Sequence, residues 1–173
     1  NSGIDADHRG YRKGLDAEAK GFGPGGARGN DSGGGYGGTG GWYSASTRAG
    51  LPYGGSNAPA YPGSAGRGEP DPSFTGGNGG GLIWIKAAGT VSVKGKITAR
   101  GAAPQINPYG GGSGGGIYII CAVLDGNADG ELNVNGGSGA GAAGGGGRIA
   151  VYRVRDTAGG GLVTETARAG VGV

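Results

Sequence analysis

The sequence contains one cysteine, one histidine and no long hydrophobic run among its 173 residues. A single cysteine excludes an internal disulfide, and the apolar run around Cys121 predicts a small buried side chain. His8 is the only histidine, so no second histidine can build a His-based metal site or a Ser-His-Asp triad. We therefore expect no catalytic residues and no bound cofactor, and the chain is not predicted to be an enzyme.

Large aliphatic and aromatic core formers are also scarce. Leu, Ile, Val and Phe together number 26, about 15 per cent of the chain, and 21 of these 26 follow Gly81. The C-terminal half can therefore build a narrow core, whereas the N-terminal half cannot build a conventional one. No apolar stretch reaches membrane-spanning length, so membrane insertion is not expected.

Charge of one sign is not concentrated anywhere in the sequence. The net charge is +3, and the basic residues are scattered among 12 acidic ones. Nucleic-acid binding proteins usually carry a basic patch or stripe, so no nucleic-acid partner is expected. The chain begins at Asn1 with neither a Met nor a signal peptide, which is consistent with a processed or partial chain and with export.

Glycine is the residue that the sequence has in abundance, with 50 copies. Ordering glycine costs more backbone entropy than ordering any other residue, so this composition indicates either a disordered linker or very close backbone packing. The longest glycine runs directly precede short β-like segments, which favours close packing. These pairs are residues 79–81 before 82–85, 114–116 before 117–119, and 144–147 before 148–151.

These glycine-led segments form an internal repeat. Aligning them places Ile83, Ile117 and Ile149 in register, and a second short strand follows each one at 95–99, 130–134 and 161–165. Residues 2–7 match the second strand alone. The chain 1–173 is therefore interpreted as one domain, with a half repeat (1–11), a glycine-rich insertion (12–81) and three β repeats (82–109, 110–143 and 144–173).

Each strand shows the period-two alternation of a β-strand with one buried face. Val91, Val93, Ile97 and Ala99 share the inner face, and Glu165 departs from this pattern in the last repeat. If equivalent strands stack in register, opposite charges lie side by side, which stabilises strand pairing. The expected pairs are Lys94 with Asp129, Lys96 with Glu131, and Asp7 with Arg100.

The insertion has a different pattern. Glycines recur every third residue between Gly23 and Gly41, with one interruption at Ser32, and this period fits one edge of a polyproline II helix. A flexible Gly/Ser linker is the alternative. The aromatic residues of the insertion favour ordered packing, because they offer surface to bury; they are Phe22, Tyr36, Trp42, Tyr43, Tyr53, Tyr61 and Phe74. The predicted fold is all-β: a short parallel β-solenoid of two-strand repeats with glycine-rich extended segments, polyproline II being the candidate conformation, and almost no helix.

Several segments resemble a glycine-rich repeat of very large secreted and cell-surface proteins, chiefly bacterial. They are residues 112–119, residues 144–152, the half repeat at 4–11 and the run 34–38. The resemblance implies an exported, solenoid-like protein with a surface or fibre-forming architecture. It brings no catalytic residues with it.

One candidate metal site is the turn Asp125, Asn127 and Asp129. Its spacing matches the opening of an EF-hand loop, but the twelfth position is Gly136 and no flanking helices are expected, so an EF-hand is excluded. A looser calcium turn is one interpretation of these residues. The alternative is an ordinary Asp/Asn/Gly turn between strands.

Asp5 and Asp7 lie on one face of the first strand, with His8 beside them. Paired carboxylates of this kind serve polysaccharide-degrading β-helix enzymes. The alternative, which we favour, is a solvated strand face on which Asp7 pairs with Arg100.

The outward-facing aromatic residues are the candidate interface or glycan site. If the isoleucines point inward, Trp84 and Tyr118 lie together on the opposite face, with Tyr152 nearby. Exposed aromatic side chains stack on sugars or become buried in a neighbouring subunit. The alternative is that the glycine-rich insertion covers this face.

These observations predict an extracellular or cell-surface structural protein, a subunit of a filament or surface fibre. The half repeat at the start and residues 171–173 at the end predict open sheet edges through which copies self-associate into a homopolymer. A glycan-binding adhesin module is the second hypothesis. A β-helix polysaccharide-degrading enzyme that uses Asp5 or Asp7 is the third.

Overall fold

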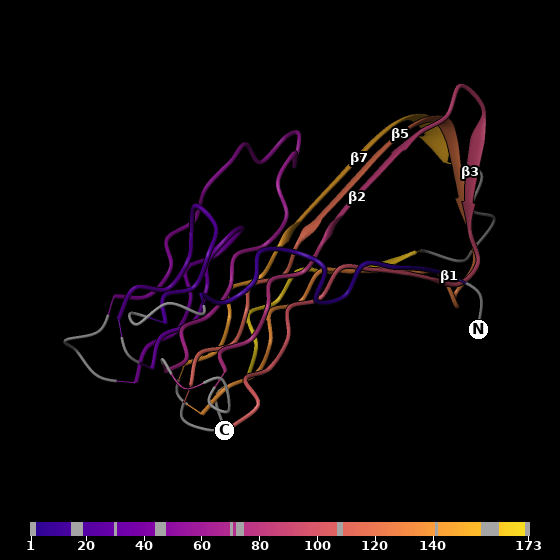
Figure 1. Ribbon diagram of the computed structural model, residues 1–173. Coiled ribbons are helices and arrows are strands. Elements are labelled where there is room, and N and C mark those ends of the chain that lie inside the picture. Colours follow the sequence, from indigo (N-terminus) through magenta and orange to yellow (C-terminus); the bar gives the residue numbers. More distant parts are fainter. Residues whose placement is uncertain are drawn as a thin grey trace.

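The computed structural model describes residues 3–14, 19–29, 31–43, 48–69, 71, 75–106, 109–140, 142–156 and 163–171. These residues contain eight β-strands and no helix, so the predicted all-β class is confirmed. The strands gather at one end of the molecule and the glycine-rich segments at the other (Figure 1). The strands are β1 (Gly3–Asp5), β2 (Leu82–Lys86), β3 (Thr90–Val93), β4 (Lys96–Thr98), β5 (Gly116–Gly126), β6 (Glu131–Asn133), β7 (Arg148–Asp156) and β8 (Thr164–Thr166).

One parallel sheet has the order β1-β4-β6-β8, so each repeat adds one short strand. Ile4 lies opposite Ile97, which lies opposite Leu132, and this is the register that the repeat alignment predicts. The last strand differs, because Glu165 rather than Val163 lies opposite Leu132. The preceding strand β7 continues well beyond its expected end at residue 151, so the second strand of this repeat begins two residues later.

The other parallel sheet is built on β5. Strands β2 and β3 pair along one edge of β5, and β7 pairs along the other edge. Ile83 lies opposite Ile117, which lies opposite Ile149, so the predicted register is confirmed. Both β5 and β7 are longer than the apolar segments that predicted them, because pairing with a neighbour continues through the less apolar residues that follow.

Strand β3 continues the path of β2 along β5 after a break at 87–89. The chain then enters the other sheet as β4, so the single face expected over 91–99 is divided between two sheets. The predicted pairing of Lys94 with Asp129 is consequently wrong. The Lys94 ammonium instead forms an ion pair with the Asp125 carboxylate at 3.7 Å, because β3 holds Lys94 beside the end of β5.

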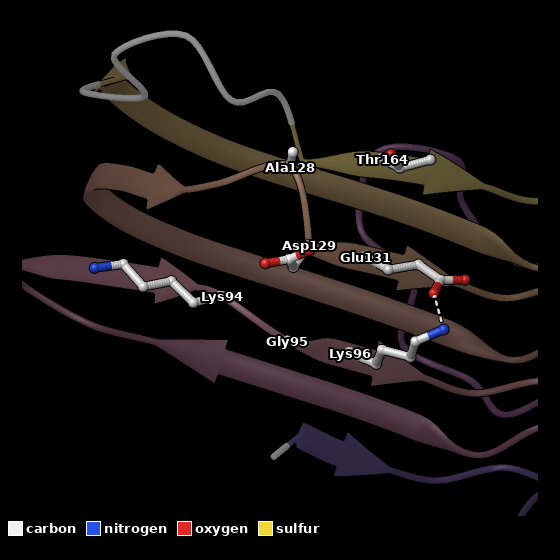
Figure 2. Close-up of a pocket in the computed structure, with 8 residues that line it drawn as sticks. Lys94, Gly95, Lys96, Ala128, Asp129, Glu131 and Thr164 are labelled. Carbon is white, nitrogen blue, oxygen red and sulfur yellow. Dashed lines mark ion pairs between the residues drawn. The ribbon is translucent and has the colours of Figure 1, made fainter. Parts of the chain in front are cut away.

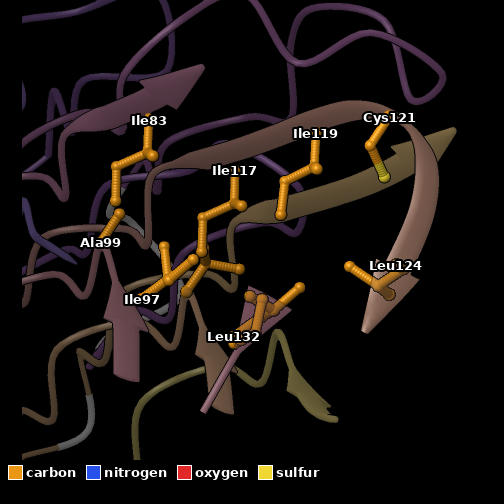
Figure 3. Packing of buried hydrophobic residues seen from close by; sticks show 10 residues of the cluster. Ile83, Ile97, Ala99, Ile117, Ile119, Cys121, Leu124 and Leu132 are labelled. Atoms are coloured by element: carbon orange, nitrogen blue, oxygen red, sulfur yellow. The ribbon is translucent and has the colours of Figure 1, made fainter. Parts of the chain in front are cut away.

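The hydrophobic core lies between the two sheets. Ile117, Ile119 and Cys121 of β5 point toward Ile97 of β4 and Leu132 of β6 (Figure 3). Ile117, Ile119 and Leu132 are fully buried, and burial of each such side chain contributes about 1.5–3 kcal/mol. Cys121 is a buried free thiol, as its apolar surroundings predict.

The described residues of the insertion 12–81 form no named strand, but they pack in an ordered way on the glycine runs of the repeats. The Gly34 N–H donates to the Gly111 carbonyl and the Gly37 N–H donates to the Gly146 carbonyl, both at 2.9 Å. A Cβ atom added at Gly37 would overlap the Gly147 carbonyl oxygen. Glycine is therefore required because neighbouring backbones lie too close for any side chain.

Two buried serines join the insertion to the second repeat. The Ser64 N–H donates to Ser113 Oγ at 2.8 Å, and the Ser113 N–H donates to the Ser64 carbonyl at 2.9 Å. Ser64 Oγ also accepts a hydrogen bond from the Gly25 N–H at 3.1 Å. These contacts satisfy polar groups that would otherwise be buried without partners.

The aromatic residues of the insertion, which favoured ordered packing over a flexible linker, differ in how far they are buried. Tyr36 is fully buried, and its ring centre lies 4.7 Å from that of Tyr53. Four of the others have large exposed fractions, because glycine backbones rather than aromatic rings fill the interior. The exposed residues are Phe22, Trp42, Tyr43 and Tyr61, and Phe74 lies outside the described residues.

Candidate functional site

Three aromatic side chains form a ladder across β2, β5 and β7. Trp84 lies directly opposite Tyr118, with 5.4 Å between ring centres. Tyr118 and Tyr152 meet edge to face at 5.7 Å. The sequence prediction that these three residues lie together on one face is confirmed, because period-two alternation places them all opposite the core.

This face is open to solvent. Trp84 is 59% exposed and Tyr152 is 47% exposed, so the alternative in which the insertion covers the aromatic residues is wrong. Along β7 the same alternation continues the face to Val154, which is 86% exposed. The aromatic ladder (Trp84, Tyr118 and Tyr152) is thus part of an exposed apolar face that can stack on a sugar ring or pack against another protein.

The residues of the candidate calcium turn do not contact one another as a single group: Asn127 and Asp129 form one turn, and Asp125 contacts β3 and the residue after it. The Asp129 N–H donates to Asn127 Oδ1 at 3.2 Å, as in an ordinary Asx turn. The Asp125 carboxylate instead accepts a hydrogen bond from Ser92 at 2.8 Å and pairs with Lys94. The hydrogen bond from Ser92, aided by the Lys94 charge, lowers the pKa of Asp125 despite some desolvation. Calcium binding at these residues stays a prediction.

Asp7 is held by Arg100, as predicted. Its carboxylate accepts hydrogen bonds from the Arg100 backbone N–H and from Nε, both at 2.7 Å, and the guanidinium completes an ion pair at 2.7 Å. Desolvation by burial raises the pKa of Asp7, but the combined hydrogen bonds from Arg100 and Thr98 outweigh it, so the pKa lies below its ordinary value. Asp5 accepts a hydrogen bond from the Asp7 N–H at 2.7 Å, and His8 is exposed beside the pair.

A charged groove of about 630 Å³ lies along the outer surface of the β4-β6-β8 sheet (Figure 2). Lys96 lies opposite Glu131, and their side chains form an ion pair at 2.7 Å, which confirms the predicted pair. Hydrogen bonds from Lys96 and then Asn133 lower the pKa of Glu131. These charges neutralise one another, so the groove has little charge left with which to attract a ligand.

No group of three or more His, Cys, Asp and Glu side chains able to hold a metal ion occurs in the described part of the chain. None of the residues that the structure describes belongs to a helix that could span a lipid bilayer. Comparison with protein-family models, curated proteins and solved structures found no match.

Proposed function

We propose that the protein is an extracellular or cell-surface structural protein whose copies assemble end to end into a filament or surface fibre. The observation that carries this proposal is the outer edge of β7. This nine-residue strand pairs with β5 on one side, and no described strand pairs with its other side. Its core-facing residues Ile149 and Val151 are only partly buried. The edge is apolar over residues 149–152 and carries charged residues at 148, 153, 155 and 156, and its apolar part is a template for another chain.

The opposite end of the sheets is similar. Strands β2 and β3 pair with β5, and no strand within the described ranges pairs with their outer edge. In the other sheet, the terminal strand β1 leaves Ile4 46% exposed. One molecule thus presents two different parallel edges at opposite ends. Contacts between unlike ends do not close on themselves and therefore extend into filaments.

In this proposal the repeats wind as a short parallel solenoid and the glycine-rich segments run as polyproline II helices. The constant register of Ile83, Ile117 and Ile149 supports the solenoid, because equivalent residues of successive repeats lie side by side in the sheet. The close backbone contacts of the glycines support polyproline II packing. The extracellular setting is part of the proposal; it comes from the resemblance expected for residues 112–119 and 144–152, for which the comparisons found no match. The proposal includes no enzymatic activity, nucleic-acid partner or membrane insertion.

A lysine on the β7 edge tests this assembly. We expect the wild-type protein to form fibres visible by negative-stain electron microscopy. We expect Val154→Lys to remain as single subunits, because it adds a further positive charge between Arg153 and Arg155 and removes the apolar side chain between them. Leu51→Lys is the matched control, since Leu51 is also exposed but lies in the insertion, and it should form fibres. Both variants should keep their free energy of unfolding within about 0.5 kcal/mol. Fibres of Val154→Lys equal to those of the wild type would contradict the proposal.

The second candidate function is a glycan-binding adhesin module. The exposed aromatic ladder supports it, because indole and phenol rings present flat surfaces on which sugars stack. Glycan-array binding that is lost in Trp84→Ala, in a variant that remains monomeric, would favour this function. Asp7 supports the third candidate, a polysaccharide-degrading enzyme, less well, because its carboxylate is occupied by Arg100.

A further inference from the structure

A second exposed apolar surface lies in the glycine-rich part of the molecule, away from the strand edges. It is a pocket of about 820 Å³. Three chain segments line it, and none of them belongs to a named strand. The lining residues are Pro24, Gly26 and Arg28, then Thr39 and Trp42, then Arg48, Ala49 and Leu51.

Backbone hydrogen bonds fix the three segments relative to one another. The Arg28 N–H donates to the Arg48 carbonyl at 3.2 Å, and the Gly40 N–H donates to the Gly50 carbonyl at 3.0 Å. The segment 48–51 thus lies between the other two. Trp42 is held by an isolated antiparallel bridge to the fully buried Ser32. The pocket therefore has a fixed frame, as expected of a site that is formed before its ligand binds.

The walls of the pocket combine two kinds of chemistry. Trp42 is 55% exposed and Leu51 is 68% exposed, so both offer apolar surface to a ligand. Arg28 and Arg48 are exposed beside them, and no ion pair to either guanidinium occurs among the described residues. Arginine is well suited to bind a carboxylate, because its fork of N–H groups matches the two oxygens.

We infer that this pocket binds an acidic saccharide, a sugar chain that carries uronic-acid carboxylates. A uronic acid has an apolar face of C–H groups and a carboxylate at the edge of the same ring. Trp42 and Leu51 can pack against the apolar face of the sugar ring, and Arg28 and Arg48 can bind its carboxylate. A neutral sugar would leave the arginines without a partner, and a small inorganic anion would leave the apolar walls uncovered.

This inference goes beyond fibre assembly, and the two can fail separately. The pocket shares no residue with the strand edges, so binding is measured with and without Val154→Lys, in both cases in a Trp84→Phe background. The protein has two tryptophans, and Trp84→Phe leaves Trp42 as the only one. The fluorescence of this variant therefore reports on the pocket alone.

The test is a titration of the Trp84→Phe variant with trigalacturonate, followed by Trp42 fluorescence. We expect a saturable change, and at least a tenfold weaker affinity for Arg28→Gln and for Arg48→Gln in the same background. Arg12→Gln, which removes an exposed arginine elsewhere, should bind like the parent. Fully methyl-esterified trigalacturonate keeps the rings but not the charge, and it should bind at least tenfold more weakly.

Three results would overturn the inference. One is the absence of a saturable change with trigalacturonate. Another is equal affinity for the methyl ester, or full affinity in Arg28→Gln and Arg48→Gln, either of which would remove the carboxylate from the recognition. The third is tighter binding of adenosine monophosphate than of trigalacturonate, which would make the site a nucleotide site.

Discussion

At the scale of single residues, two aspartates, Asp31 and Asp7, are expected to affect stability most through their charge, because folding partly buries both. Asp31 has a φ of 51°, in the left-handed region that few side chains other than Asn, Asp and Gly adopt readily. Desolvation by burial, together with repulsion from Glu69, raises the pKa of Asp31, and Arg67 offsets only part of this. The ionised carboxylate thus opposes folding.

Asp31→Asn should therefore stabilise the protein. Because the pKa in the folded state is raised, stability associated with Asp31 is present below the pKa of the unfolded chain and is lost as pH rises through the folded value. Asparagine keeps the left-handed backbone and removes the charge. We expect the free energy of unfolding at pH 7 to rise by about 0.5–2 kcal/mol in chemical denaturation. A gain that persists unchanged at pH 3 would contradict an electrostatic origin.

Asp7 changes stability with pH in the opposite direction from Asp31, because its pKa in the folded state is lowered. Its contribution is present above the pKa of the unfolded chain, about 3.9, and is lost as pH falls through the lower folded value. Asp7→Asn should cost about 1–3 kcal/mol at pH 7, since it removes hydrogen bonds and the ion pair with Arg100.

Measured at decreasing pH, the stability difference between wild type and Asp7→Asn should shrink below about pH 4. Asp129→Asn removes the same charge from an exposed turn and should change stability by less than about 0.5 kcal/mol. A constant cost of Asp7→Asn from pH 7 to pH 2 would show that the Asp7 charge is not the cause.

At the scale of strands and glycine runs, the sequence predicts positions better than lengths. The runs before Ile83, Ile117 and Ile149 mark where strands begin, because glycine is needed where backbones converge just outside each sheet. The ends of β5 and β7 have no such signal, since they depend on pairing with the neighbouring strand. The predicted pairing of Lys94 with Asp129 is wrong because the chain changes sheet after β3. The alternation of apolar and polar residues continues through this change, so the sequence does not indicate it.

Glycines in these runs should tolerate no side chain. A Cβ atom at Gly114 would overlap the carbonyl oxygen of Val134, whereas one at Gly55 would meet no atom within 4 Å. We expect Gly114→Ala to cost about 1–3 kcal/mol or more in thermal or chemical unfolding. Gly55→Ala should instead stabilise by about 0.4–1 kcal/mol, because it restricts the unfolded chain. Equal effects of the two substitutions would contradict the close packing of glycine backbones.

At the scale of the whole molecule, the chain combines two kinds of packing. Parallel sheets surround a narrow aliphatic core at one end, and glycine backbones pack directly on one another at the other end (Figure 1). The aromatic ladder could be predicted from alternation within strands. The pocket around Trp42 could not, because the glycine period of 23–41 does not indicate which segments come together, and Arg28, Trp42 and Arg48 meet only through glycine packing.

If copies stack through their strand edges, fibre diffraction should record the spacing of the strands. Concentrated protein, dried and aligned, should give a reflection at about 4.7–4.9 Å along the fibre axis, the spacing of neighbouring strands, because the sheets continue from one copy to the next. A monodisperse monomer at high concentration, with no aligned fibres and no such reflection, would rule out stacking through the strand edges.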